Sequence, residues 1–81
     1  MDAAVAFGTV LRRLRQEAGL TQEQLGFEAD LRRTYVSVLE LGQQQPSLTT
    51  ILKLASALKQ PAHELMRLVE AEISKPRRKK V

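Results

Sequence analysis

The apolar residues of this chain recur every three or four positions, in five short segments separated by glycine, proline or polar residues. This spacing matches the 3.6-residue period of an α-helix, whereas a half-buried strand would alternate at every second position. No segment of the sequence alternates in that way. The pattern therefore predicts an all-α fold of five short helices.

The first two helices have clear start signals. The first is expected at residues 3–18, with Asp2 as its N-cap and Gly19 as its stop. Its inward face carries Phe7, Leu11, Leu14 and Ala18. Thr21 and Gln24 have the spacing of a capping box at the start of a short second helix. The inward residues of that helix are Leu25 and Ala29.

The other three helices follow a tight turn at Asp30 and Leu31. The third is expected at about residues 32–41, with Val36 and Leu39 pointing inward. Ser47 caps the fourth, whose predicted inward residues are Leu48, Ile51, Leu52, Ala55 and Leu58. Pro61 suits the first turn of the fifth, because a missing N–H costs nothing there. The apolar residues of the fifth helix are Leu65, Leu68, Val69 and Ile73.

Charge divides the chain into two parts. The net charge is +4, with 13 basic and nine acidic residues in 81. Five of the basic residues lie in a tail at residues 75–81, so residues 1–74 carry eight basic and nine acidic residues, a balance of −1. We expect one domain at 1–74, followed by a disordered basic tail. The tail either adds contacts to phosphates or acts only as a solubilising end.

Composition argues against several classes of function. There is no cysteine, which removes disulfides and thiolate metal sites, and His63 is the only histidine, so no metal site is expected. The sequence holds no nucleophile–base set and no glycine-rich phosphate loop, so we expect neither an enzyme nor a cofactor. No apolar run approaches the roughly 18–20 residues that span a bilayer. We expect a soluble, cytoplasmic protein with no membrane partner.

Residues 21–41 have the layout of a helix-turn-helix, in which two short helices are joined by a tight turn. With Val36 and Leu39 inward, helical geometry places four residues on one outward stripe: Arg33, Thr34, Ser37 and Val38. We predict that this stripe contacts DNA bases in the major groove. Arg33 suits guanine O6 and N7, and Val38 suits a thymine methyl group.

Between Gly19 and Leu65 the chain resembles the phage repressor and Cro (XRE-like) helix-turn-helix superfamily. The matching segments are GLTQEQL (19–25), VSVLELG (36–42), PSL (46–48) and ILKLASAL (51–58). The run RTYVS (33–37) is similar to the recognition helix of restriction–modification controller proteins. The resemblance implies a five-helix, lambda-repressor-like domain. It also implies a sequence-specific transcriptional regulator that binds double-stranded DNA as a homodimer on a near-palindromic operator.

The resemblance also assigns roles to further residues. It implies DNA backbone contacts from Gln22, Arg32, Tyr35, Gln43 and Gln44. The alternatives are that Gln22 only supports its cap and that Tyr35 is a partly buried core residue. It implies a structural ion pair between Arg15 and Glu40. The chain departs from the family at Gly26, where alanine is usual, and at Arg32, where a small hydroxyl residue often caps the third helix.

Partners and regulation leave alternatives open. The fifth helix and the connector that precedes it offer the best homodimer surface, with Leu65, Met66, Val69 and Ile73, unless these residues only close the core of one protomer. Binding over a promoter would repress transcription, and binding upstream of it could recruit polymerase. The alternative function is an antitoxin that binds a toxin protein and its own operator.

Overall fold

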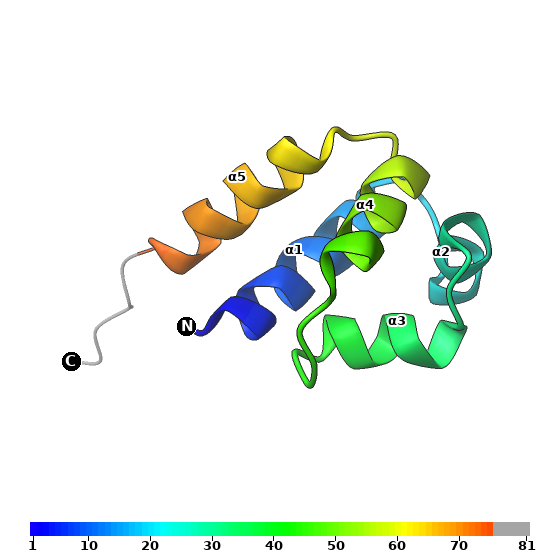
Figure 1. Cartoon of the computed structure of the whole chain (residues 1–81), viewed down its shortest axis with the longest axis horizontal. Helices are drawn as coiled ribbons and strands as arrows, with labels where there is room; N and C mark the ends of the chain where they lie inside the picture. The colour runs from blue at the N-terminus through cyan, green and yellow to red at the C-terminus, as the bar shows by residue number, and fades with distance from the viewer. Residues whose placement is uncertain (76–81) are drawn as a thin grey trace.

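A computed structural model of the chain describes residues 1–75. It consists of five helices and, within those residues, no strand, which confirms the all-α prediction. The helices are α1 (Ala3–Glu17), α2 (Gln22–Ala29), α3 (Arg33–Glu40), α4 (Leu48–Ala57) and α5 (Ala62–Ile73). Figure 1 shows α5 running alongside α1, while α2 and α3 meet at the opposite end of the molecule.

Three of the five helices begin with the side-chain caps that the sequence predicts. Asp2 Oδ1 accepts a hydrogen bond from the Val5 N–H at 2.9 Å. Thr21 and Gln24 form both bonds of the capping box, at 3.0 and 2.9 Å. Ser47 Oγ accepts from the Thr50 N–H at 3.1 Å. These bonds satisfy backbone N–H groups that have no partner inside a helix.

The other two helix starts have no side-chain cap. Arg32 precedes α3 without a capping hydrogen bond from its side chain, as its departure from the family pattern suggests. Pro61 occupies the N-cap position of α5, one residue before the first turn in which we expected it. Its extended backbone, with ψ of 145°, explains the difference, because an N-cap residue is not itself helical.

Two helices end on a non-glycine residue in the left-handed conformation. Asp30 has φ 58° after α2, as its residue type predicts. Lys59 has φ 59° after α4, which no sequence signal indicated. Local backbone bonds support this geometry, because the Lys59 N–H donates to the Ser56 carbonyl oxygen at 3.0 Å and the Gln60 N–H donates to the Ala55 carbonyl oxygen at 2.9 Å, the Schellman pattern of a helix end.

The centre of the core contains one leucine from every helix. These side chains are at most 1% exposed: Leu11, Leu25, Leu39, Leu54 and Leu65. Because each helix contributes a leucine to the same cluster, displacement of any helix from the core would open a cavity in that cluster.

The predicted inward face of α4 is wrong in part. Leu48 and Leu52 are 72% and 52% exposed, whereas Leu54, which the prediction left outside, is fully buried. The physical reason is that α4 carries apolar residues around most of its circumference, so the periodicity fits two faces almost equally well. Packing against α2 and α5 decides between them.

A carboxylate of α5 faces α1 at the end of the fold nearest the C-terminus. The side chain of Glu72 is 7% exposed, and its Oε1 lies 3.4 Å from Arg13 Nη1 and 3.3 Å from Lys75 Nζ. Hydrogen bonds from Lys75 and Arg13 lower the pKa of Glu72, against the opposing effect of burial. The pairing with Arg13 holds the last turn of α5 against α1.

The basic tail predicted at 75–81 lies outside the described residues except for Lys75. Among residues 1–75, no helix has both the length and the apolar character that crossing a bilayer requires.

The helices α1 and α3 approach each other most closely at Gly8, which is buried. A Cβ at this position would lie 2.4 Å from the carbonyl oxygen of Leu39 and 2.6 Å from that of Glu40. Both neighbours are backbone atoms, which cannot turn aside as a flexible side chain can. Glycine is therefore required at this crossing.

We expect Gly8→Ala to destabilise the fold by about 1–3 kcal/mol, the usual cost of overpacking a core, although alanine is the better helix former. Thermal unfolding followed by circular dichroism measures the change. Gln16→Ala, an exposed position on the same helix, is the matched control and should leave the midpoint nearly unchanged. A Gly8→Ala variant as stable as wild type would show that α1 and α3 can separate at little cost.

Candidate nucleic-acid interface

The turn between α2 and α3 is compact because its backbone closes on itself. The Leu31 N–H donates to the Gly26 carbonyl oxygen at 2.8 Å. A Cβ on Gly26 would lie 2.7 Å from the Leu31 carbonyl oxygen, so the glycine lets the turn fold back onto α2. This contact accounts for glycine at a position where the family usually has alanine.

The core fixes which face of α3 points outward. Val36 and Leu39 are fully buried. On the opposite side, Arg33 and Thr34 are exposed at the first turn of α3, and Ser37 and Val38 are half-buried on the next turn. The four residues predicted to contact bases thus share the outward half of α3, with the most accessible pair at its N-terminal end. Their contacts with DNA remain a prediction.

Sequence reasoning missed Leu41, which is 63% exposed directly after the last residue of α3. It follows Ser37 by four positions and Val38 by three, which is the spacing of one helix face. That spacing was a usable signal, but we interpreted Leu41 only as the end of the helix. The structure extends the outward stripe with an apolar side chain.

Three of the residues predicted to contact the DNA backbone lie just outside the two ends of α3. Arg32 precedes α3 and is exposed, and Gln43 and Gln44 are exposed in the loop that follows it. Tyr35 is half-buried and packs against the core, so its ring has a structural role whether or not its hydroxyl reaches a phosphate. Exposed donors therefore flank the outward stripe before and after the helix.

The structure joins Arg15 to Glu40, the two residues paired by the sequence analysis. Arg15 Nε and Nη2 donate to the two carboxylate oxygens of Glu40, at 2.6 and 3.1 Å. Arg15 Nη1 also donates to the Leu20 carbonyl oxygen at 2.9 Å. The side chains of Arg15 and Glu40 are 13% and 3% exposed. The hydrogen bond to Glu40 raises the pKa of Arg15, so the guanidinium of Arg15 stays charged at every physiological pH.

Gln22 belongs to the same network, which the sequence did not predict. Its Nε2 donates to Glu40 Oε1 at 3.0 Å, across 18 residues of chain. The side-chain amide that we expected to face a phosphate is thus already bonded to a carboxylate of α3. Glu40 accepts hydrogen bonds from α1 and from α2 at once.

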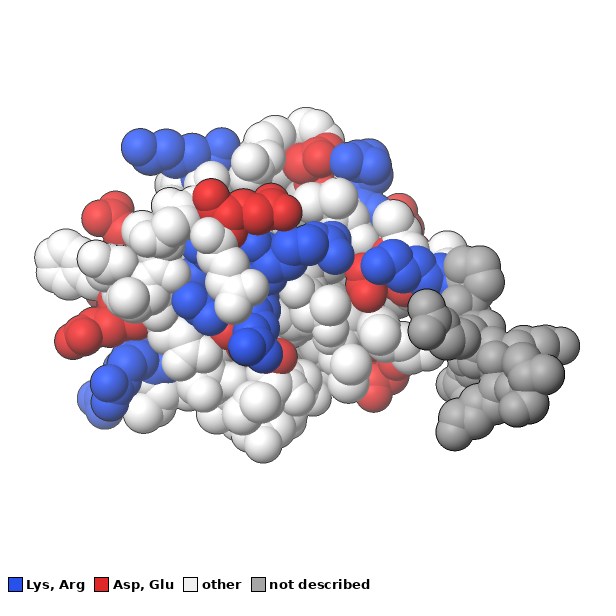
Figure 2. All heavy atoms as spheres, turned by 180° about the vertical axis from the view of Figure 1, so that it is seen from behind, with Lys and Arg blue, Asp and Glu red and all other residues white. Residues whose placement is uncertain are grey.

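Charge is unevenly spread over the surface of the molecule. Figure 2 shows Lys and Arg side chains gathered over the middle of one face, with Asp and Glu around them. The helix α1 carries three arginines, Arg12, Arg13 and Arg15. The helix α3 itself carries one cation, Arg33, and one anion, the buried Glu40.

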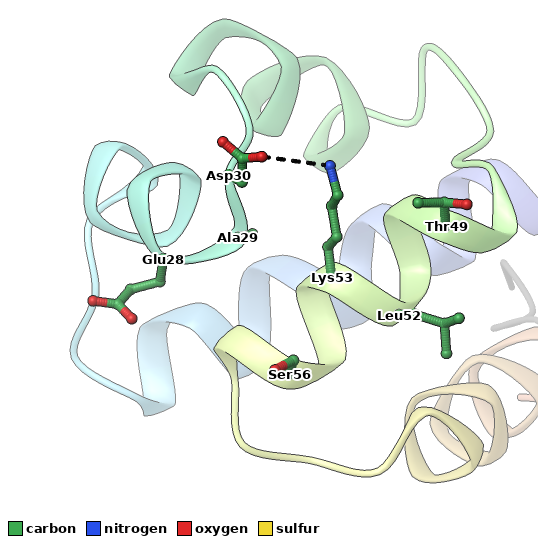
Figure 3. A pocket seen from close by; sticks show the side chains of 7 residues that line it. All are labelled: Glu28, Ala29, Asp30, Thr49, Leu52, Lys53 and Ser56. Atoms are coloured by element: carbon green, nitrogen blue, oxygen red, sulfur yellow. Dashed lines mark ion pairs between the residues drawn. The ribbon is translucent and has the colours of Figure 1, made fainter.

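A hollow between α2 and α4 is a second place where a ligand could bind (Figure 3). Its lining residues are Glu28, Ala29, Asp30, Thr49, Leu52, Lys53 and Ser56. The ion pair of Lys53 with Asp30 spans 3.8 Å, and the Asp30 side chain is 95% exposed, so water surrounds the pair. An exposed pair of this kind fixes neither charge in place. Within residues 1–75, no cluster of three His, Asp or Glu side chains could hold a metal ion.

Comparison with known proteins agrees with this geometry. A family model described as "Helix-turn-helix" matches residues 11–65, which include α2, the turn and α3. The control protein C.MunI of a Mycoplasma species is 36% identical over 72 residues, covering 88% of this chain and 97% of that protein. The control protein C.BamHI of Bacillus amyloliquefaciens is 43% identical over 53 residues, covering 64% of this chain and 65% of that protein.

A solved structure shows the same arrangement of helices. The restriction–modification controller protein C.AhdI from Aeromonas hydrophila superimposes with a TM-score of 0.75 at 50% sequence identity. The match covers 76% of this chain and 94% of that one.

The buried pair makes a prediction about stability. We expect Arg15→Met to destabilise the protein by about 3–5 kcal/mol, because it leaves the carboxylate of Glu40 buried without its cation. The matched control is Lys53→Met, whose partner Asp30 is exposed, and it should change stability by less than about 1 kcal/mol. Chemical denaturation of the two variants measures both values. Equal effects would show that Glu40 is not held in a buried pair.

Proposed function

The chain belongs to the helix-turn-helix family, and from this we propose that it is a transcriptional regulator that reads DNA through the outward face of α3. The observation that carries the proposal is the orientation of α3. Val36 and Leu39 are buried in the core, while Arg33 and Thr34 are exposed at the first turn. The N-terminal turn of such a helix is the part that enters the major groove.

The residues on and beside the outward stripe make different kinds of contact with DNA in this proposal. Arg33 is exposed, and its guanidinium suits the two acceptors of guanine, O6 and N7. Thr34 and Ser37 donate or accept hydrogen bonds, and Val38 offers a methyl surface to thymine. Arg32, Gln43 and Gln44 bind phosphates at either end of α3, which fixes the position of the helix but carries no sequence information.

The relatives favour a regulator of the controller type over an antitoxin. C.MunI and C.BamHI are named as control proteins and C.AhdI as a restriction–modification controller. None of these three is named as an antitoxin. A family of DNA-binding regulators is generally non-enzymatic. The Asp30–Lys53 pair does not suggest a catalytic site, because the Asp30 side chain is surrounded by water.

Selection of binding sites from a random pool of double-stranded DNA tests the proposal. We expect a near-palindromic motif for the wild-type protein. We expect Arg33→Ala to weaken binding to that motif by about 5–150-fold, the range that corresponds to a bidentate contact worth about 1–3 kcal/mol, and to lose the preference for guanine at one position of each half-site. Arg67→Ala, on α5, is the control and should keep the motif. Enrichment of no motif by the wild-type protein would refute the proposal.

Homodimerisation through α4 and α5 is part of the same proposal. One recognition helix reads few base pairs, and a dimer places two of them about 34 Å apart along the DNA. Of the four residues predicted to contact a partner, Leu65 and Val69 are 1% and 7% exposed and belong to the core of one protomer. Ile73 is 41% exposed and Met66 is half-buried, so these two keep surface for a partner.

The structure offers a better apolar surface on α4, the ridge formed by Leu48 and Leu52. These residues are one helical turn apart and are 72% and 52% exposed. Leu52 lies at the edge of the hollow that holds Asp30 and Lys53, and Figure 3 shows its side chain directed away from Lys53. A ridge of this kind can pack against the same ridge of a second copy across a two-fold axis. We therefore place the dimer contact on Leu48 and Leu52, and keep Met66 and Ile73 of α5 as further candidates.

We expect Leu52→Glu to convert the dimer into a folded monomer, because it places a charge in the proposed contact. Sedimentation equilibrium measures the mass, and circular dichroism confirms the fold. Phe27→Glu is the matched control, since Phe27 on α2 is 84% exposed and lies outside the ridge. Dissociation of the Phe27 variant, or a dimer that survives Leu52→Glu, would move the interface elsewhere.

A further inference from the structure

The carboxylate of Glu40 gathers hydrogen bonds from two other helices at the last turn of α3. Arg15 of α1 approaches both oxygens, and Gln22 of α2 donates its Nε2–H to Oε1 at 3.0 Å. The Glu40 side chain is 3% exposed, so water cannot replace a donor that is removed. The amide of Gln22 therefore has a defined structural partner inside the protein.

The position of Glu40 on α3 connects this network to the outward stripe of the helix. Glu40 follows Arg33 by seven positions and Ser37 by three, so the three side chains lie on the same flank of the helix. The bonds that Glu40 accepts from Arg15 and Gln22, together with the burial of Val36 and Leu39, therefore constrain the rotation of α3 about its own axis. That rotation decides where the Arg33 guanidinium points.

We propose that Gln22 is a positioning residue for base recognition, which acts through Glu40 on the orientation of Arg33. This inference rests on the proposed function. The bond to Glu40 uses one of the two N–H donors of the Gln22 amide, so the phosphate contact that the sequence suggested for Gln22 stays a separate prediction. Binding constellations tolerate errors of only about 10–20° in the orientation of their supporting elements, so a single bond at the end of an eight-residue helix is enough to matter.

A phosphate contact and a positioning bond predict different losses of DNA affinity when Gln22 is replaced. A phosphate contact contributes equally to every DNA sequence, because the backbone is the same everywhere. A positioning bond contributes only where Arg33 meets its correct base. The ratio of operator affinity to random-duplex affinity separates the two roles.

Gln22→Met is the informative variant, since methionine has a similar shape but donates no hydrogen bond. We expect its affinity for the selected operator to fall about 10-fold, while its affinity for a random duplex of equal length stays within about 2-fold, a pattern typical of lost base discrimination. The control Gln16→Met makes the same chemical change on an exposed residue of α1 and should leave both affinities unaltered.

A combination of substitutions shows whether Gln22 acts through Arg33. We expect Arg33→Ala to cost less in the Gln22→Met background than in the wild-type protein, because Arg33 is already misplaced there. Strict additivity of the two substitutions would overturn the proposal. So would an equal loss of affinity for operator and random DNA, which is the signature of a phosphate contact.

A measurement without DNA keeps this inference separate from the proposed function. In the ¹H–¹⁵N spectrum of the free protein, we expect Gln22→Met to shift the backbone amide signals of α3 as far as Arg33. Shifts confined to the neighbours of Gln22 would refute the positioning role. A wild-type protein that selects no operator would instead refute the proposed function, whatever the spectrum shows.

Discussion

The arrangement of the first three helices depends on one buried carboxylate. Glu40 is almost fully withdrawn from water, and a carboxylate in that position costs several kcal/mol unless it is paired and hydrogen-bonded. Arg15 and Gln22 supply those bonds from α1 and α2. Because Gly8 brings the backbone of α1 against the carbonyl of the same Glu40, the network and the closest helix crossing coincide. A shift of α3 would disturb both at once.

The helix α3 exists only as part of this assembly. An isolated helix of eight residues is not stable in water, since helices shorter than about 12–15 residues are marginal even with favourable sequences. Two buried residues, Val36 and Leu39, hold α3 to the core on one side, and Glu40 holds it at the end. The outward side chains are thereby freed from any stabilising task, and their identities can follow the DNA sequence to be read.

Local features of the fold were predictable from sequence, and long-range ones were not. The capping box of Thr21 and Gln24 depends on neighbours three positions apart, which the sequence displays directly. The inward face of α4 depends on what packs against it, so Leu54 and Leu52 exchanged places relative to the prediction. The bond from Gln22 to Glu40 joins residues 18 positions apart and leaves no periodic signal. The predicted site residues gathered around α3 because they follow local helical geometry.

The low positive charge of α3 favours dimerisation as the way to obtain affinity for DNA. Residues 1–74 are slightly acidic in total, and α3 offers only Arg33 as an exposed cation. Nonspecific affinity for DNA grows with the number of phosphates that cations neutralise, so one protomer gains little from this source. Two protomers joined through the ridge of Leu48 and Leu52 would add their hydrogen bonds and base contacts on one operator. Occupancy of the operator then rises more steeply than the protein concentration, which makes that concentration the natural control variable for such a regulator.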